Sequence, residues 1–234
     1  MPEATVKPIL KGTTMNDYPI KEMSTDTLLT TTRSVRKRLD FSRDVPLALV
    51  RECLEIALQA PTSANRQHWS FIVIADADQR NRIGEIYKRQ WDWLAAGPFS
   101  VAARFADDPT RAPGQAKTAD SGAYLAEHLA EVPILVLPCI EVEGDGPPTA
   151  ADQADTWGSI MPAAWNYMLA AHTRGLGTAW TSLTTRVNDE IRTIVGYPDN
   201  VYHATLIPTA YFIGEGFTPG KRQPLDDVLH VDTW

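Results

Sequence analysis

The chain has 234 residues, a hydrophobic content of 44%, a charged content of 22% and a formal net charge of −7. This length can bury a large core without a disulfide or a structural metal. The acidic balance argues against nucleic acid or an anionic membrane as the main partner, because both attract basic surfaces. No stretch has the length of a transmembrane helix and the start of the chain has no signal-peptide core, so we expect a cytoplasmic protein.

The two cysteines and the first residues limit the architecture further. Cys53 and Cys139 lie in apolar runs and are predicted to be buried reduced thiols, which fits a reducing compartment. There is no CxxC pair and no Cys/His cluster with metal-ligand spacing, so no metal site is expected. Residues 1–22 are interrupted by Pro and Gly and are predicted to be a flexible arm, free or wrapped over a partner subunit. Residues 23–234 are predicted to form a single domain.

A basic run, TTRSVRKRL, follows a short predicted helix that Ser24 or Thr25 would cap, with Leu28 and Leu29 facing inward. Three interpretations of the run are open: a solvated surface, a nucleic-acid contact or a phosphate clamp. We favour the clamp, because an Arg guanidinium matches phosphate bidentately and the neighbouring Ser34 hydroxyl can donate. The basic residues of the run are Arg33, Arg36, Lys37 and Arg38.

The next elements are an amphipathic helix, a strand and a polar helix. Pro46 suits the first turn of the helix, which ends before Pro61. Residues 71–75, FIVIA, predict a buried strand, and Asp76 begins a helix that continues through Tyr87. The expected buried face of the first helix consists of Leu47, Val50, Leu54, Ala57 and Leu58.

Residues 60–69, APTSANRQHW, form an unusually long and polar connection between the helix and the strand. Most connections need only two to six residues. This one contains small hydroxyls, an Asn, an Arg and a Gln, which are groups that can hydrogen-bond a polar ligand. The pattern therefore predicts a ligand-binding loop.

Residues 88–120 show no sustained period and are predicted to be an irregular, variable insertion that serves as a lid. The segment is rich in aromatic residues. These side chains either fill the core or line a pocket for a flat substrate, and the sequence leaves both possibilities open. They are Trp91, Trp93, Phe99 and Phe105.

The second half of the chain alternates helices and strands. Residues 121–131 predict a helix with a Ser or Asp cap, and residues 132–142 a strand buried on both faces. Residues 144–148 predict a surface loop. Residues 157–171 predict a helix that is apolar on nearly all sides, as in a large core or a subunit interface, and Gly175 and Gly177 end it.

The last predicted elements are a short helix and a strand. Asn188 is the expected cap of a helix over 188–195. The GTAWTSL segment before it reads as extended. Residues 206–213 predict a strand, in which Pro208 implies an edge or bulge position, because Pro cannot donate to a ladder.

The sequence contains no recognisable motif for a catalytic nucleophile or general base. The five histidines are scattered, and GxSxG, GxGxxG after a strand and a P-loop are all absent. A chain with phosphate-binding pieces and a ligand loop, but no reactive group of its own, indicates that a bound cofactor carries the chemistry.

The motif order TTRSVRKRL, ALQAPTSANRQHWSFIVI, GLGTAWTSL, LIPTAYFIG and KRQPLDD resembles the FMN-dependent nitroreductase family, in particular its actinobacterial-type branch. The resemblance covers roughly residues 25–234. It implies an α+β fold with a mostly antiparallel central sheet flanked by helices, and an intertwined homodimer with two FMN sites built from both chains. It also implies ping-pong chemistry, in which NADH or NADPH reduces FMN and a small aromatic oxidant such as a nitroaromatic or a quinone is then reduced.

The resemblance assigns the basic run to the flavin. The family's RRSxR turn lies on residues 32–36, with Arg33 and Ser34 at the phosphate and ribityl chain. Arg36 would reach the pyrimidine edge of the ring, where a cation stabilises negative charge and raises the flavin potential. The family often has a second Arg where Thr32 lies, so this chain departs from the pattern there.

The resemblance also assigns three further segments. The family's APSxxNxQPW loop contacts a flavin held mainly by the other chain, and His68 stands where the family usually has Pro. Thr181, Ser182 and Leu183 would run beside flavin N5 and O4, and Lys221 and Arg222 would close the phosphate end. The loop residues implied to bind the cofactor are Pro61, Thr62, Ser63, Asn65 and Gln67.

Two rivals remain for the function. Another flavin enzyme on the same scaffold would be a dehydrogenase, an ene-reductase or a reductive dehalogenase. A protein of a different class would bind flavin without turnover.

Overall fold

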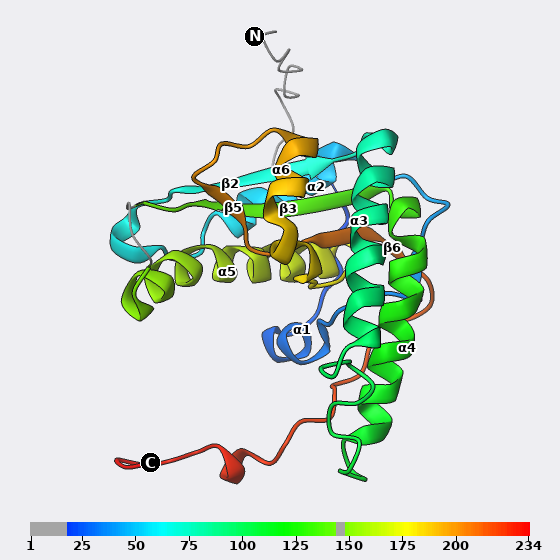
Figure 1. The fold of residues 1–234 in the computed structure, drawn as a ribbon, viewed down its shortest axis with the longest axis vertical. Helices are drawn as coiled ribbons and strands as arrows, with labels where there is room; N and C mark the ends of the chain where they lie inside the picture. Colours follow the sequence, from blue (N-terminus) through cyan, green and yellow to red (C-terminus); the bar gives the residue numbers. More distant parts are fainter. Residues whose placement is uncertain (1–17, 144–147) are drawn as a thin grey trace, which may run out of the picture.

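Six strands form one antiparallel sheet in the computed structural model, which describes residues 18–143 and 148–234 (Figure 1). The expected α+β class, with an antiparallel sheet flanked by helices, is confirmed. Residues 144–147 of the expected loop and residues 1–17 of the expected arm lie outside the described residues. The strands run β1 (Leu39–Asp40), β6 (Ile207–Phe212), β3 (Ile134–Glu141), β2 (Trp69–Ile74), with β4 (Leu176–Thr178) on β6 and β5 (Val201–His203) on β3.

Helices cover both faces of the sheet. α2 (Leu47–Ala57) and α5 (Ala150–Thr173) pack on one face, and α1 (Thr25–Thr31) contacts α5. The other face is covered by α3 (Ala77–Ala96), α4 (Ala112–His128) and α6 (Asn188–Val195). Four short 3-10 helices complete the described elements: η1 (Ser63–Asn65), η2 (Leu129–Glu131), η3 (Leu183–Val187) and η4 (Leu225–Asp227).

β3 is the central strand, and it explains the unbroken apolar run in the sequence. Leu135 and Leu137 belong to the core beneath α3 and α4, whereas Ile134 and Val136 belong to the core beneath α2 and α5. Successive side chains of a strand point to opposite faces, so a strand covered on both sides needs apolar residues at every position.

The two strand prolines lie in central strands, so the expected edge position of Pro208 is wrong. The Pro208 carbonyl accepts from the Ala179 N–H at 3.2 Å. The nitrogen and carbonyl of one strand residue face the same side, so the missing N–H lies just beyond β4. The Pro138 carbonyl accepts from the Ala204 N–H at 2.8 Å, in the gap between β5 and β6. Each proline is tolerated because its nitrogen meets a break in the neighbouring strand.

The segment 88–120 is more regular than the sequence indicated. α3 continues to Ala96 and α4 begins at Ala112, so only 97–111 lies outside these helices. The far ends of α3 and α4 project together below the sheet in Figure 1. Trp91 packs against α4 at Gly122, where a Cβ would come within 2.3 Å of the indole. The role as a lid stays a prediction.

Several helix boundaries and faces differ from the expected ones. α4 has no side-chain cap, and α5 begins at Ala150 through a capping box of Thr149 and Asp152. Val187, not Asn188, precedes α6. Leu29 is 49% exposed in the single chain and does not face inward. Val50 and Ala57 of α2 are buried as expected, whereas Leu47 and the C-cap residue Leu58 are exposed. The rest of the buried face consists of Leu49, Glu52 and Cys53.

A buried ion pair joins α2 to the end of α5. Arg174 Nε donates to Glu52 Oε1 at 2.8 Å, and both side chains are almost fully buried. It fixes the point at which the chain turns into β4. Cys53 and Cys139 are buried and free, as expected, and burial raises the pKa of both thiols to about 12. Within the described segments, no helix combines the length and apolarity needed to cross a membrane.

Candidate cofactor site

The RSVR segment is attached edge-on to β4. The Val35 N–H donates to the Thr178 carbonyl at 2.7 Å, and Val35 is buried. The Ser34 Oγ accepts from the Trp180 N–H at 2.9 Å. The hydroxyl proton of Ser34 therefore remains available for a further partner. These bonds bring the basic run beside the segment 181–183.

Two arginines far apart in the sequence meet at Gly220. A Cβ at Gly220 would lie 2.9 Å from Arg33 Nη2 and 2.7 Å from Arg222 Nη1. None of the ion pairs formed by the described residues involves either arginine. Two guanidinium groups close together without a carboxylate repel each other, and an anion between them relieves that repulsion. The absence of a side chain at Gly220 leaves room for this arrangement.

Arg36 forms a second cationic point, deeper in the fold. Its guanidinium approaches the Ser121 hydroxyl at 3.5 Å and carries no carboxylate partner among the described residues. Burial lowers the pKa of Arg36. The buried Tyr87 lies nearby, and its hydroxyl accepts from Thr181 Oγ1 at 3.0 Å. A partly buried cation of this kind favours a negative charge beside it.

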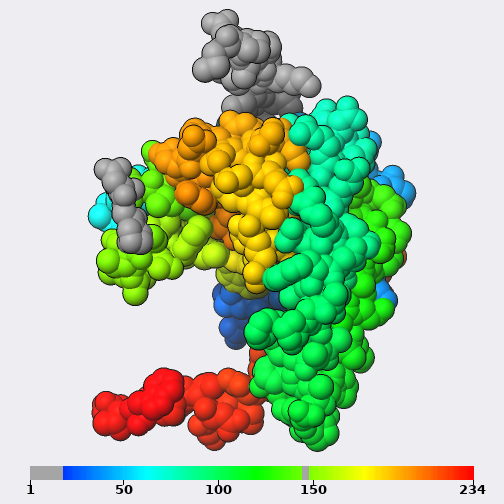
Figure 2. Space-filling view, viewed as in Figure 1, coloured from blue at the N-terminus to red at the C-terminus, as the bar shows by residue number. Residues whose placement is uncertain are grey.

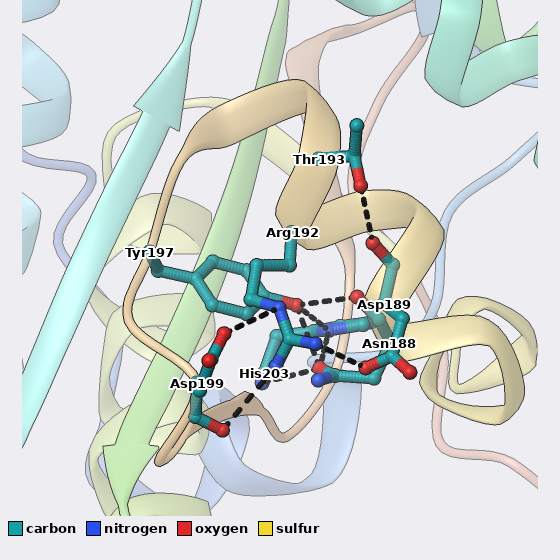
Figure 3. A network of polar contacts seen from close by, with 7 residues as sticks. All are labelled: Asn188, Asp189, Arg192, Thr193, Tyr197, Asp199 and His203. Atoms are coloured by element: carbon teal, nitrogen blue, oxygen red, sulfur yellow. Dashed lines mark hydrogen bonds and ion pairs between the residues drawn. The ribbon is translucent and has the colours of Figure 1, made fainter. Parts of the chain in front are cut away.

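The segment 181–183 is held from behind by a buried polar network. Thr205 Oγ1 donates to the Thr181 carbonyl at 2.8 Å, and Thr184 Oγ1 lies 3.0 Å from His203 Nε2. The other ring nitrogen of His203 contacts Asn188 Oδ1 at 2.9 Å and the Tyr197 hydroxyl at 3.1 Å (Figure 3). Burial lowers the pKa of His203 to about 4, so the ring is neutral at pH 7.

We call Arg33, Ser34, Arg36, Thr181–Leu183, Lys221 and Arg222 the arginine wall. The other two basic residues of the run point elsewhere. Lys37 pairs with Asp120 at 2.5 Å on the surface, and Arg38 donates to backbone carbonyls of residues 213–216. The basic run is therefore divided between a candidate anion site and other contacts.

The polar loop, residues 61–67, has an unusual backbone. Ala64, Asn65 and Gln67 have φ values of 49°, 53° and 50°, in the left-handed region that non-glycine residues seldom adopt. The Ser63 N–H donates to Ser159 Oγ at 2.9 Å, which fixes the loop to α5. Gln67 Nε2 donates to Asn65 Oδ1 at 2.9 Å, and both side chains are otherwise exposed. Strain of this kind concentrates at binding sites.

The polar loop and the arginine wall are not joined within one chain. No hydrogen bond or ion pair of the described residues links them, and Figure 1 places the loop at the left edge, where β2 starts, with α1 below the centre. The structure thus brings Arg33 to Arg222 and the RSVR segment to the start of residues 181–183, and no bond joins these residues to the polar loop.

The two departures from the family pattern have local explanations. Thr32 follows α1, where its hydroxyl donates to the Leu28 carbonyl at 2.7 Å, so it serves the end of the helix. The His68 carbonyl accepts from the Glu141 N–H at 3.0 Å, a bond that a proline could equally accept.

Sequence reasoning missed three residues that build the site. Tyr87 appeared only as a helix residue, although it lies between Arg36 and Thr181. Gly220 gave no signal beyond its place in a loop, and Ser159 lies within an apolar helix. A polar residue on a buried helix face, as at Ser159, is the one signal that could have been followed.

Comparison with known proteins supplies the context. The family model described as "Nitroreductase family" matches residues 29–210. A protein of Methanothermobacter thermautotrophicus named "Putative NADH dehydrogenase/NAD(P)H nitroreductase" is 24% identical over 229 residues, covering 96% of this chain and 95% of the relative. Iodotyrosine deiodinase 1 of Homo sapiens is 26% identical over 222 residues, covering 92% of this chain and 72% of the relative.

Solved structures share the fold. Oxidized iodotyrosine deiodinase bound to FMN and 3-iodo-L-tyrosine aligns with a TM-score of 0.64 at 18% identity, covering 89% of this chain and 98% of that one. A nitroreductase-like family protein from Bacillus cereus aligns with a TM-score of 0.61 at 17% identity, covering 90% and 97%. The family model spans well over half of the chain, and the chain therefore belongs to the nitroreductase family.

Proposed function

We propose that the protein is an FMN-dependent oxidoreductase that takes electrons from NADH or NADPH and reduces small, flat, electron-poor aromatic compounds. The observation that carries this proposal is the meeting of Arg33 and Arg222 at Gly220 without a carboxylate partner in the described part of the chain. A terminal phosphate is the anion that such a pair of forks fits best. Bound FMN would supply hydride and electron transfer at its ring.

The residues present fit an FMN molecule in two respects. The phosphate would lie at Arg33, Arg222 and Lys221, with the free proton of Ser34 beside it. The ring would lie toward Arg36, whose positive charge lacks a carboxylate partner among the described residues. No side chain of the arginine wall is required to take or give a proton, since the cofactor carries the hydride and solvent can supply protons.

We further propose a homodimer, in which the polar loop of one chain faces the arginine wall of the other. The separation of these two regions within one chain supports this arrangement. Figure 2 shows the C-terminal tail standing clear of the body, with open space between the tail and the part of the body above it. Apolar residues that stand exposed on a tail indicate a partner surface. Those of the tail are Leu225, Val228, Leu229, Val231 and Trp234.

Reductive dehalogenation is the second candidate reaction. It is favoured by the relatives named iodotyrosine deiodinase and by the structure of such an enzyme with FMN and 3-iodo-L-tyrosine. The substrate would lie over the ring, near the projecting ends of α3 and α4, where Trp93 and Phe99 are exposed. We place the protein in the cytoplasm because both cysteines are free thiols. We also propose that the protein belongs to the actinobacterial-type branch of the family.

The purified protein tests the proposal directly. A yellow protein with a flavin spectrum is expected. Anaerobic NADH or NADPH should bleach the spectrum, and a nitroarene should restore it. A halogenated tyrosine that restores it instead would favour the dehalogenase, whereas a bound flavin that no nicotinamide reduces would favour a binding protein. A colourless protein that binds no added FMN would overturn the proposal.

A further inference from the structure

Arg38, the last arginine of the basic run, binds backbone carbonyls of the chain itself and is not among the residues proposed to contact the cofactor. Its Nε donates to the Ile213 carbonyl at 2.7 Å, its Nη1 to the Gly216 carbonyl at 3.3 Å, and its Nη2 to the Glu215 carbonyl. One guanidinium thus holds three carbonyls of four consecutive residues. The guanidinium carbon of Arg38, Cζ, also lies 4.3 Å from the centre of the Phe217 ring, within the range of a cation–π contact.

The segment 213–216 is shaped around this side chain. The Ile213 N–H donates to the Arg38 carbonyl at 2.8 Å, which extends the pairing of β1 with β6 by one step. Gly214 has a φ of +86°, and a Cβ there would lie 3.1 Å from Arg38 Nη2. The turn therefore both needs glycine and closes over the guanidinium.

The position of this turn matters because the C-terminal tail, residues 217–234, follows directly after it. Six residues after Gly216, Arg222 stands beside Arg33 at Gly220. The same basic run thus contacts the tail twice, at its root through Arg38 and at the candidate phosphate site through Arg33. The neighbouring Lys37 takes no part, since it pairs with Asp120.

We propose that Arg38 is a positioning residue, which holds the root of the tail in the one orientation that brings Arg222 to Arg33. The inference rests on the proposed function for the identity of the ligand, FMN. An arginine suits this role because its planar fork presents five donors in fixed directions. A lysine offers one ammonium nitrogen and cannot hold three carbonyls in this geometry.

The first test compares FMN with riboflavin, which lacks the phosphate. Arg38→Met keeps an apolar stem against Phe217 and removes the fork, and Lys37→Met is the matched control with the same loss of charge. Arg38→Met should weaken FMN binding about tenfold through a misplaced Arg222 and leave riboflavin binding unchanged, whereas Lys37→Met should alter neither. A general structural defect would weaken both ligands equally and would overturn the proposal.

Two further measurements keep the outcome clear. Added to Arg222→Ala, Arg38→Met should cause no additional loss of FMN affinity, because the residue that it positions is gone. In the protein without ligand, amide exchange across 213–222 should accelerate in Arg38→Met and not in Lys37→Met. Unchanged exchange there would refute the positioning role, and this holds whether or not the wild type binds FMN. If Arg38→Met fails to fold, Arg38→Lys takes its place, with the same direction of change expected.

Discussion

The arginine wall and the polar loop differ in how the fold supports them. Within the wall, the RSVR segment is bonded to Thr178 and Trp180, and residues 181–183 pack on the network around His203, so this part is fixed within one chain. The loop is held to α5 by one bond from the Ser63 N–H and has three residues in the left-handed region. A site that needs both would be rigid on one side and completed by a second copy on the other.

The largest expected effect is the recovery of FMN binding when two variants are mixed, one defective in the arginine wall and the other in the polar loop. The double variant Arg33→Ala/Arg222→Ala lacks the wall, and Asn65→Ala/Gln67→Ala lacks the loop contacts, so each homodimer should lose FMN. If the two regions meet across the dimer, co-refolding at equal amounts should restore about a quarter of the wild-type sites, since half of the random dimers are mixed and each holds one intact site. The measurement is flavin absorbance after gel filtration, and wild type taken through the same refolding is the control. No recovery would place both regions in one chain's site.

Lowering the pH should destabilise the folded protein through His203, whose buried network packs against the arginine wall. Burial lowers the pKa of His203 from 6.5 to about 4, so the unfolded chain binds more protons than the folded one between these values. The stability is therefore full above pH 6.5 and falls as the pH drops toward 4, by on the order of 3 kcal/mol in all. Urea unfolding at stepped pH measures this fall. His203→Gln, which cannot titrate, should show a shallower fall, and an identical slope would contradict the assignment.

Removing Arg222 tests the phosphate end. Arg222→Ala should weaken FMN binding by roughly 1.5–3 kcal/mol, because a charge-assisted hydrogen bond to phosphate is lost. Lys221→Ala removes the same charge one residue earlier and should cost less, because it is Arg222 that lies beside Arg33 at Gly220. Quenching of flavin fluorescence on titration gives both affinities. Equal losses in the two variants would show that net charge matters and that the meeting at Gly220 does not.

The sheet and the basic run were predictable from the sequence because their signals are local. β3 is apolar from Ile134 to Ile140 since helices cover both of its faces, and that pattern indicated a buried strand. The division of the run was not predictable. Arg33, Arg36 and Arg38 look alike in sequence, and only their partners, at Gly220, Ser121 and residues 213–216, separate their roles.

The errors share one physical cause, which is that neighbours in space decide what a local pattern leaves open. Pro208 was expected at an edge because a proline cannot donate, yet a central strand accepts it where β4 ends. The segment 88–120 appeared irregular because its aromatic residues follow no helical period. Its two helices, α3 and α4, are stabilised instead by packing against each other, for example where Trp91 of α3 contacts Gly122 of α4.

The weak attachment of the polar loop gives the smallest expected effect. Ser159→Ala leaves the Ser63 N–H without its partner, at a cost of about 1 kcal/mol confined to the loop. Because the bond lies in the loop and not in the wall, amide exchange at Ser63 should accelerate while exchange at Val35 stays unchanged. The FMN affinity should fall only a few-fold, less than in Arg222→Ala. Exchange that accelerates equally at Val35 would mean that the loop and the wall form one cooperative unit, and the contrast between them would then be wrong.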